Sequence, residues 1–170
     1  MYELHQNEQY FFNQSTLEHL ADFVQYFSRP CCLCVPLLGK TLAERGVTVR
    51  ILDVDERFAS VPGFQSYDIH HPVWIEEEFD LIICDPPFYN VSLSQLFTAI
   101  RKLAHFNYHQ SLIVSYLKRR SANVLGTFSP FNLVETGYYP GYQTVQDVER
   151  NKIEFFSNLD QQYIEHLLTR

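Results

Sequence analysis

Short runs of apolar residues alternate along the chain with longer segments in which apolar residues recur at helical spacing. The runs that predict buried strands cover residues 31–35, 47–52, 64–67, 79–84 and 111–116. Spacings of three and four predict helices between them, the first of which carries Leu17, Leu20, Ala21, Val24 and Phe27. Strands that alternate with helices predict an α/β fold with a mostly parallel sheet.

Several residues mark the ends of the predicted helices. The sequence of residues 15–18, Ser-Thr-Leu-Glu, has the form of a capping box, which predicts that the first helix starts there. Pro36 suits the first turn of the second helix, and Gly46 is suited to end it. Ser92 is a suitable cap for a third helix. A short amphipathic helix is predicted near the end of the chain, around residues 163–168.

The last third of the chain predicts an antiparallel feature. Residues 132–138 and 152–156 are typical of two strands, joined by a connection rich in Tyr, Gly and Pro, so we expect a hairpin at one sheet edge.

With 170 residues, 46% of them hydrophobic, the chain predicts a single domain of residues 1–170. This composition excludes bulk disorder and fibrous repeats.

Membrane and metal partners are not expected. No apolar run approaches the ~20 residues that span a bilayer, and the first residues lack the pattern of a secretion signal, so we expect a cytoplasmic protein. Cys31, Cys32 and Cys34 lie together, and Cys84 is isolated, which does not match the paired spacing of zinc ligands. We interpret the cysteines as small buried apolar residues.

The charge of the chain bears on its partners. Thirteen Lys and Arg residues against twenty Asp and Glu give a formal net charge of -7, so the average surface repels phosphate polymers and favours a basic partner. One cationic run, residues 118–120, is small enough to be the solvated start of a helix. The 11 Tyr and 14 Phe residues are numerous enough to line a site as well as fill a core.

Acidic residues and prolines follow the predicted strands. Ligands of open α/β sheets bind beyond the carboxyl ends of the strands, where this chain carries Asp53, Asp55, Asp68 and the sequence Asp-Pro-Pro-Phe at residues 85–88. Two successive prolines fix the backbone and remove N–H donors. The loop therefore presents carbonyl oxygens and the Asp85 carboxylate as rigid acceptors for an amino group.

An Asp-Pro-Pro-aromatic sequence directly after an apolar strand resembles the N6-adenine-methyltransferase-like family of S-adenosylmethionine-dependent N-methyltransferases. The resemblance extends over most of the chain, through residues 9–12, 51–58, 67–72 and 150–155 in that order. It is greatest to a small branch first named probable N6-adenine methyltransferases, whose eukaryotic members are lysine methyltransferases acting on translation elongation factor 1A. The resemblance implies a Rossmann-like fold with S-adenosyl-L-methionine as cofactor.

The resemblance also implies roles for individual residues. Those implied for catalysis are Asp85, Pro86, Pro87 and Phe88. Those implied for cofactor binding are Tyr10, Phe11, Phe12, Ser15, Pro36, Gly39, Asp53, Asp55 and Asp68. Asp53 would bind the ribose hydroxyls, with Asp55 as its competitor, and Asp68 would meet the adenine ring. Those implied for the acceptor pocket are Tyr89, Asn90, Tyr139, Tyr142 and Asn151.

Two questions stay open at this point. Residues 35–40 lack the Gly-x-Gly turn common in methyltransferases, so a binding subunit without catalysis is an alternative to an enzyme. Helix amides of residues 37–39 could hold the methionine carboxylate instead. The acceptor is either a lysine of a basic, elongation-factor-like protein or an adenine of DNA or RNA, and the net charge of -7 favours lysine.

Overall fold

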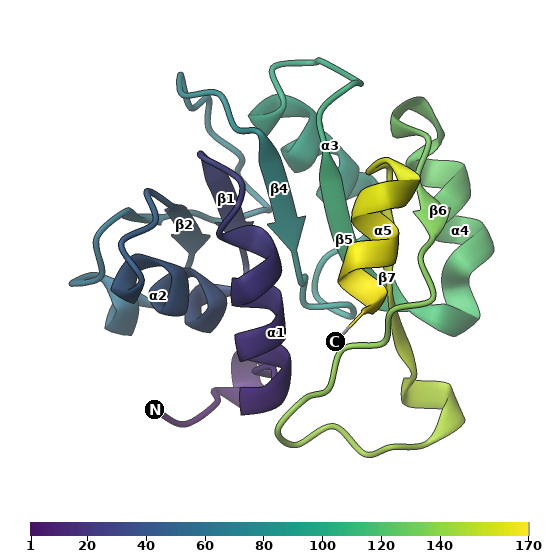
Figure 1. The fold of residues 1–170 in the computed structure, drawn as a ribbon, viewed down its shortest axis with the longest axis horizontal. Helices are drawn as coiled ribbons and strands as arrows, with labels where there is room; N and C mark the ends of the chain where they lie inside the picture. Colours follow the sequence, from purple (N-terminus) through teal and green to yellow (C-terminus); the bar gives the residue numbers. More distant parts are fainter. Residues whose placement is uncertain (170) are drawn as a thin grey trace.

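The computed structural model describes residues 1–169 and consists of a seven-stranded sheet with helices on both faces (Figure 1). The strands are β1 (Pro30–Leu33), β2 (Arg50–Asp53), β3 (Phe64–Ser66), β4 (Leu81–Cys84), β5 (Leu112–Leu117), β6 (Val134–Glu135) and β7 (Ile153–Ser157). Their order is β3-β2-β1-β4-β5-β7-β6, and only the pairings of β7 with β5 and β6 are antiparallel. The predicted Rossmann-like fold, with its mostly parallel sheet and antiparallel edge hairpin, is confirmed.

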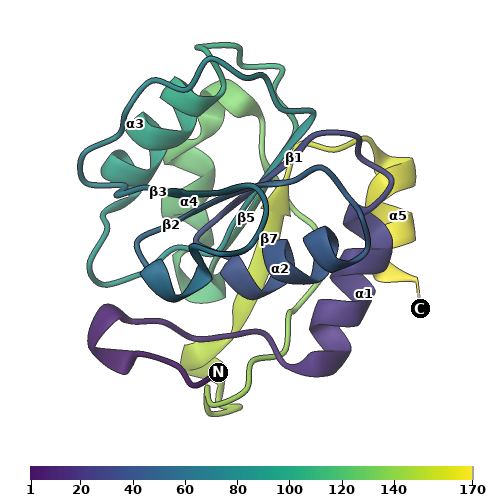
Figure 2. The ribbon, with the colours of Figure 1, turned by 90° about the vertical axis from the view of Figure 1, so that its left-hand side faces the viewer.

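The helices cover the two faces of the sheet unequally (Figure 2). On one face lie α1 (Gln14–Val24), α2 (Pro36–Glu44) and α5 (Gln161–Leu168). On the other lie α3 (Leu93–Leu103) and α4 (Ser121–Thr127). Each face buries its own apolar cluster against the strands, which drives the packing of both layers. None of the helices formed by residues 1–169 is long and apolar enough to cross a membrane.

The observed cap of α3 is the residue predicted from the sequence, whereas the observed cap of α1 is a different residue. Ser92 caps the start of α3 as predicted, and with Gln95 it forms a capping box. The predicted start of α1 is wrong, because the cap is Asn13, whose side-chain oxygen accepts a hydrogen bond from the Thr16 amide at 2.9 Å. Ser15 therefore lies inside α1.

Several strands are shorter than predicted. Pairing with β1 begins at Arg50, so residues 47–49 precede β2 instead of forming part of it. β6 ends at Glu135 because Gly137 turns the chain with a φ of 79°. The seven-residue helix α4 was not predicted, since Val124 is its one fully buried side chain and gives no helical period.

Two segments far apart in sequence meet beyond the carboxyl ends of the parallel strands (Figure 1). The segment before α1 and the connection before β7 are joined by a bridge between Phe12 and Tyr142. The Asn13 amide donates to the Gly141 carbonyl and the Gln143 amide to the Phe11 carbonyl, both at 2.9 Å. The two segments form the outer wall of a cleft whose floor is the edge of the sheet.

Candidate active site

A cleft opens at the carboxyl ends of β1, β2 and β4, where a ligand site is expected in this fold. Its lining includes these predicted site residues: Tyr10, Phe11, Phe12, Pro36, Asp53, Asp55, Asp85, Pro86, Pro87, Phe88, Tyr89 and Tyr142. It does not include Ser15, Gly39, Asp68, Asn90, Tyr139 and Asn151. The loops after three strands thus converge as the sequence predicted, together with the segment before α1.

Asp85 is held at the floor of the cleft by two hydroxyl groups. The Ser115 hydroxyl and the Tyr142 hydroxyl, the latter at 2.9 Å, both donate to the same oxygen, Oδ1. Within residues 1–169, no hydrogen bond is made to Oδ2. Burial raises the pKa of Asp85 to about 7, against the lowering effect of the two hydroxyls. The carboxyl group is therefore fixed in orientation, with one oxygen left to accept a hydrogen bond and a pKa close to neutral pH.

The prolines after Asp85 restrict which carbonyl can act with it. The Pro87 carbonyl accepts a hydrogen bond from the Val91 amide at 3.1 Å, so it is already used by the protein. The Pro86 carbonyl accepts none from the described part of the chain. Of the acceptors that the motif predicted, the structure leaves the Asp85 carboxylate and the Pro86 carbonyl. Phe88 packs edge-on against Tyr116, with ring centroids 5.1 Å apart.

Asp53 is a buried carboxylate at the end of β2 that has few partners. Its Oδ1 accepts a hydrogen bond from the Asp55 amide at 2.8 Å. Burial raises the pKa of Asp53 to about 6. A carboxylate removed from water without a matching cation favours a ligand that donates hydrogen bonds.

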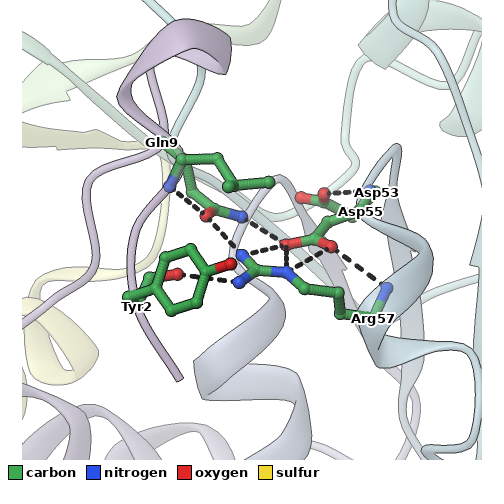
Figure 3. Close-up of polar contacts among 6 residues, drawn as sticks. Tyr2, Gln9, Asp53, Asp55 and Arg57 are labelled. Carbon is green, nitrogen blue, oxygen red and sulfur yellow. Dashed lines mark hydrogen bonds and ion pairs between the residues drawn. The ribbon is translucent and has the colours of Figure 1, made fainter.

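Asp55, in contrast, is fully engaged by the protein (Figure 3). The Arg57 guanidinium donates to both Asp55 oxygens, and the Gln9 amide donates to Oδ2 at 2.8 Å. Burial alone would raise the pKa of Asp55, but these hydrogen bonds outweigh it and lower that pKa. Arg57 also donates to the Gln9 side chain and to the Tyr2 carbonyl, so this network ties the segment before α1 to the end of β2.

The turn between β1 and α2 replaces the missing glycines with Cys34, which adopts the left-handed conformation at a φ of 61°. The Gly39 amide donates to the Val35 carbonyl at 3.0 Å, so it is not available to a ligand as expected. A Cβ on Gly39 would lie 2.5 Å from Ile51 Cγ1, which shows that this glycine serves the packing of α2 on β2. The amides of the first turn of α2 belong to Leu37 and Leu38, which lie two and one positions before Gly39.

The other predicted residues outside the lining have protein partners of their own. Asp68 accepts hydrogen bonds from the His70 amide at 2.9 Å and from both neighbouring imidazoles. The Asn90 carbonyl contacts the His70 ring, and Asn151 donates to the Gln146 carbonyl. Ser15 is exposed on α1, and Tyr139 lies beneath the Lys152 ammonium group, 4.3 Å from its ring centroid.

Sequence reasoning missed Gln9, Arg57 and Ser115. Ser115 had a visible signal, since it is a polar residue within the apolar run of β5. Arg57 lies two positions after Asp55, which is a local signal for an ion pair. Among residues 1–169, no group of three or more His, Cys, Asp or Glu side chains is placed to hold a metal ion.

Comparison with solved structures supports the fold. An N-methyltransferase, NodS, from Bradyrhizobium japonicum WM9 is 18% identical and has a TM-score of 0.54, with 86% of this chain and 94% of that chain covered. A magnesium protoporphyrin IX methyltransferase from Synechocystis PCC 6803, with bound SAM, is 14% identical with a TM-score of 0.55, covering 85% and 78%. A ribosomal protein L11 methylase from Lactobacillus delbrueckii subsp. bulgaricus is 13% identical with a TM-score of 0.54, covering 89% and 81%.

The three proteins share a methyltransferase fold while their names give different acceptors or none, so the fold alone does not identify an acceptor. No curated protein sequence matches this chain. The family evidence comes from the sequence profile described as "Probable N6-adenine methyltransferase", which matches residues 3–161. Over nearly its whole length, and with the fold that such an enzyme requires, the chain belongs to that family.

Proposed function

We propose that the protein transfers a methyl group from S-adenosylmethionine to an amino nitrogen. The observation that carries this proposal is the Asp85 carboxyl group, fixed by two hydroxyls on Oδ1 beside the Pro86 carbonyl. An amino group that donates one hydrogen to each of these acceptors turns its lone pair away from them. Asp85, with a pKa of about 7, takes up the proton that the amine loses as its new N–C bond forms.

The residues of the cleft fit S-adenosylmethionine. The cofactor supplies a methyl group on a sulfonium sulfur, which keeps the electron pair of the broken C–S bond. Asp53, buried and with no cation paired to it within residues 1–169, suits the two hydroxyl donors of the ribose. Leu37 and Leu38 line the cleft from the first turn of α2, where amides and the helix dipole favour the carboxylate of the methionine end.

The acceptor is proposed to be a lysine side chain or an adenine amino group. The net charge of -7 and the resemblance to elongation-factor lysine methyltransferases favour a lysine on a basic protein. A lysine must first lose a proton, at a cost of roughly 4–5 kcal/mol at pH 7. Adenine is neutral but has to leave its stack before its amine can reach the floor of the cleft.

A binding subunit without catalysis is the second candidate, and the Cys34 turn is the observation that favours it. The close approach of backbone to cofactor that glycines allow is restricted there. The organised environment of Asp85 supports the enzyme instead, because a buried carboxyl with a raised pKa costs stability and, within residues 1–169, has no cation paired with it.

Calorimetry and labelling test the proposal. S-adenosylmethionine is expected to bind at micromolar concentration, and labelled cofactor should mark a component of a cell lysate. Asp85→Ala should retain cofactor binding and abolish transfer, while Asp22→Ala, which changes an exposed aspartate on α1, should retain both. Absence of heat at high micromolar cofactor would remove the enzyme proposal, and wild-type transfer by Asp85→Ala would contradict the role of Asp85.

A further inference from the structure

The segment between β4 and α3 carries the Asp-Pro-Pro-Phe sequence and forms neither helix nor strand. We call its residues 85–91 the motif loop. Two prolines remove backbone donors from this loop, so it can make few hydrogen bonds of its own. One is internal, from the Val91 amide to the Pro87 carbonyl at 3.1 Å. Because Asp85 and the Pro86 carbonyl act together only while the loop keeps its shape, contacts that reach the loop from other segments bear on the proposed reaction.

Two side chains from other segments hold the motif loop. Glu8, which lines the cleft from the segment before α1, accepts a hydrogen bond from the Tyr89 amide at 2.9 Å. His70, four residues after the end of β3, has its Nε2 atom 2.7 Å from the Asn90 carbonyl oxygen. The two contacts fall on consecutive residues, directly after the aromatic residue of Asp-Pro-Pro-Phe. His70 therefore joins the segment after β3 to the loop that carries the proposed reactive groups.

The ring of His70 lies between two oxygens that can only accept hydrogen bonds. Its Nδ1 atom is 3.0 Å from Asp68 Oδ1, and its Nε2 atom faces the Asn90 carbonyl oxygen. Asp68 is ionised, because hydrogen bonds from the His70 amide and from the two neighbouring imidazoles lower the pKa of its carboxyl group. Neutral imidazole has one N–H group, whereas imidazolium has two. Both contacts are therefore hydrogen bonds only when His70 carries a positive charge.

The surroundings of His70 favour this charged form. The hydrogen bond to the Asn90 carbonyl, together with the hydrogen bond to Asp68 and its charge, raises the pKa of His70 above its ordinary 6.5. Among residues 1–169, Asp68 is the charged group that acts on His70, and His71 is a second imidazole on the same carboxylate, at 3.1 Å.

Loss of the charge on His70 breaks the contact with the motif loop. A carboxylate is a stronger acceptor than a carbonyl, so the single proton of neutral His70 stays on Nδ1, beside Asp68. The lone pair of Nε2 then faces the Asn90 carbonyl oxygen at 2.7 Å, which is repulsive. The bridge is thus favoured below pH 6.5 and lost as the pH rises through the raised pKa of His70.

On the basis of the proposed function, we propose that His70 is a positioning residue for methyl transfer. As an imidazolium held by Asp68, it fixes the Asn90 carbonyl and with it the motif loop. The Pro86 carbonyl then stays beside the Asp85 carboxyl group, where both accept from the amino group of the acceptor. In the described part of the chain the cleft lining contains neither His70 nor Asp68, so both act through the loop and not on a ligand.

Nitrogen-15 NMR tests the charge and the contact without any acceptor substrate. Both ring nitrogens of His70 should be protonated at pH 6, and the Tyr89 and Val91 amide signals should follow the titration of the ring. His70→Gln keeps an N–H donor but does not titrate, so the amide signals should lose this component. Asp85 titrates in both proteins, so the difference between the two curves isolates His70. His71→Gln is the matched control, because it removes the other imidazole from Asp68 and should leave the amide titration unchanged.

The pH dependence of methyl transfer gives the functional readout. Initial rates are measured with saturating labelled S-adenosylmethionine and cell lysate as the source of acceptor. The ratio of the wild-type rate to the His70→Phe rate should be about ten at pH 6, the low end for a hydrogen bond of a charged group, because the ring is partly exposed. The ratio should approach one at pH 9, and the pH dependence of the acceptor cancels in it. His70→Gln should recover most of the rate at pH 6.

The outcomes separate this inference from the proposed function. A ratio that falls toward one between pH 6 and pH 9, with recovery by His70→Gln and unchanged calorimetric cofactor binding, supports the positioning role. The same ratio at both pH values overturns it, as does a neutral His70 ring at pH 6 or an equal loss of transfer in His71→Gln. Absence of methyl transfer by the wild type would refute the proposed function, whereas the NMR titration would still decide whether His70 holds the motif loop.

Discussion

Replacing Asp85 with asparagine is expected to stabilise the protein while abolishing methyl transfer. The asparagine carbonyl can still accept from the Ser115 and Tyr142 hydroxyls, so the change removes a charge and keeps the contacts. Folding raises the pKa of Asp85 from its ordinary 3.8 to about 7 because the group is buried. The folded state then binds this proton more tightly than the unfolded state, and the carboxyl group lowers stability as pH rises from about 4 to about 7.

The size of the effect follows from linkage. At about 1.4 kcal/mol per pH unit, the buried carboxylate costs about 4 kcal/mol at pH 8 and about 2 kcal/mol at pH 5. Asparagine does not titrate, so the stability gained in Asp85→Asn should grow by about 2 kcal/mol between these values. Asp53, whose pKa of about 6 also changes the stability in this range, is present in both proteins and largely cancels in the comparison.

Urea unfolding at pH 5, 6, 7 and 8 measures this difference, with free energies obtained by linear extrapolation. Asp22→Asn is the control, because its side chain is 68% exposed and should give a difference within about 0.5 kcal/mol at every pH. An Asp85→Asn protein whose stability relative to the wild type stays constant from pH 5 to pH 8, or falls, would refute the reasoning that burial leaves this carboxyl group near neutrality.

Three further substitutions test the site and its supports. Tyr142→Phe removes one hydrogen bond to the Asp85 carboxylate, worth about 1.5–3 kcal/mol, so the acidic limb of the pH–rate profile should move up by about one to two pH units. Gly39→Ala places a methyl group against Ile51 and should lower the urea-unfolding free energy by about 1–3 kcal/mol; wild-type stability would contradict the packing role. Cys34→Gly should be more stable than Cys34→Ala by about 1 kcal/mol, since only glycine relieves the left-handed backbone, and the reverse order in urea unfolding would exclude strain there.

The strands, most helices and the position of the cleft could be predicted because they depend on local patterns. The apolar runs of β4 and β5 are buried throughout, and the residues that follow the strands lie at one edge of a parallel sheet by geometry alone. The predicted first and last residues of the strands were less accurate. The start of β2, for example, is set by its register with β1 rather than by its own residues.

Features that depend on contacts between distant segments could not be predicted. The pairing of Gln9 with Asp55 joins positions 46 residues apart, and nothing in either segment indicates it. The run at residues 118–120 was interpreted as a solvated helix start because Arg150 and Lys152 reach it only through the antiparallel pairing of β5 with β7. The turn at Cys34 has no glycine to signal its left-handed backbone.

The bridge between Phe12 and Tyr142 couples the opening of the cleft to two hydrogen bonds at once. The Asn13 amide donates to the Gly141 carbonyl and the Gln143 amide to the Phe11 carbonyl, each at 2.9 Å, so neither segment can leave the cleft without the other. Hydrogen exchange should therefore show these two amides opening at a common rate, distinct from that of the strands. Movement of this wall would then be one collective motion of the two segments rather than two independent ones.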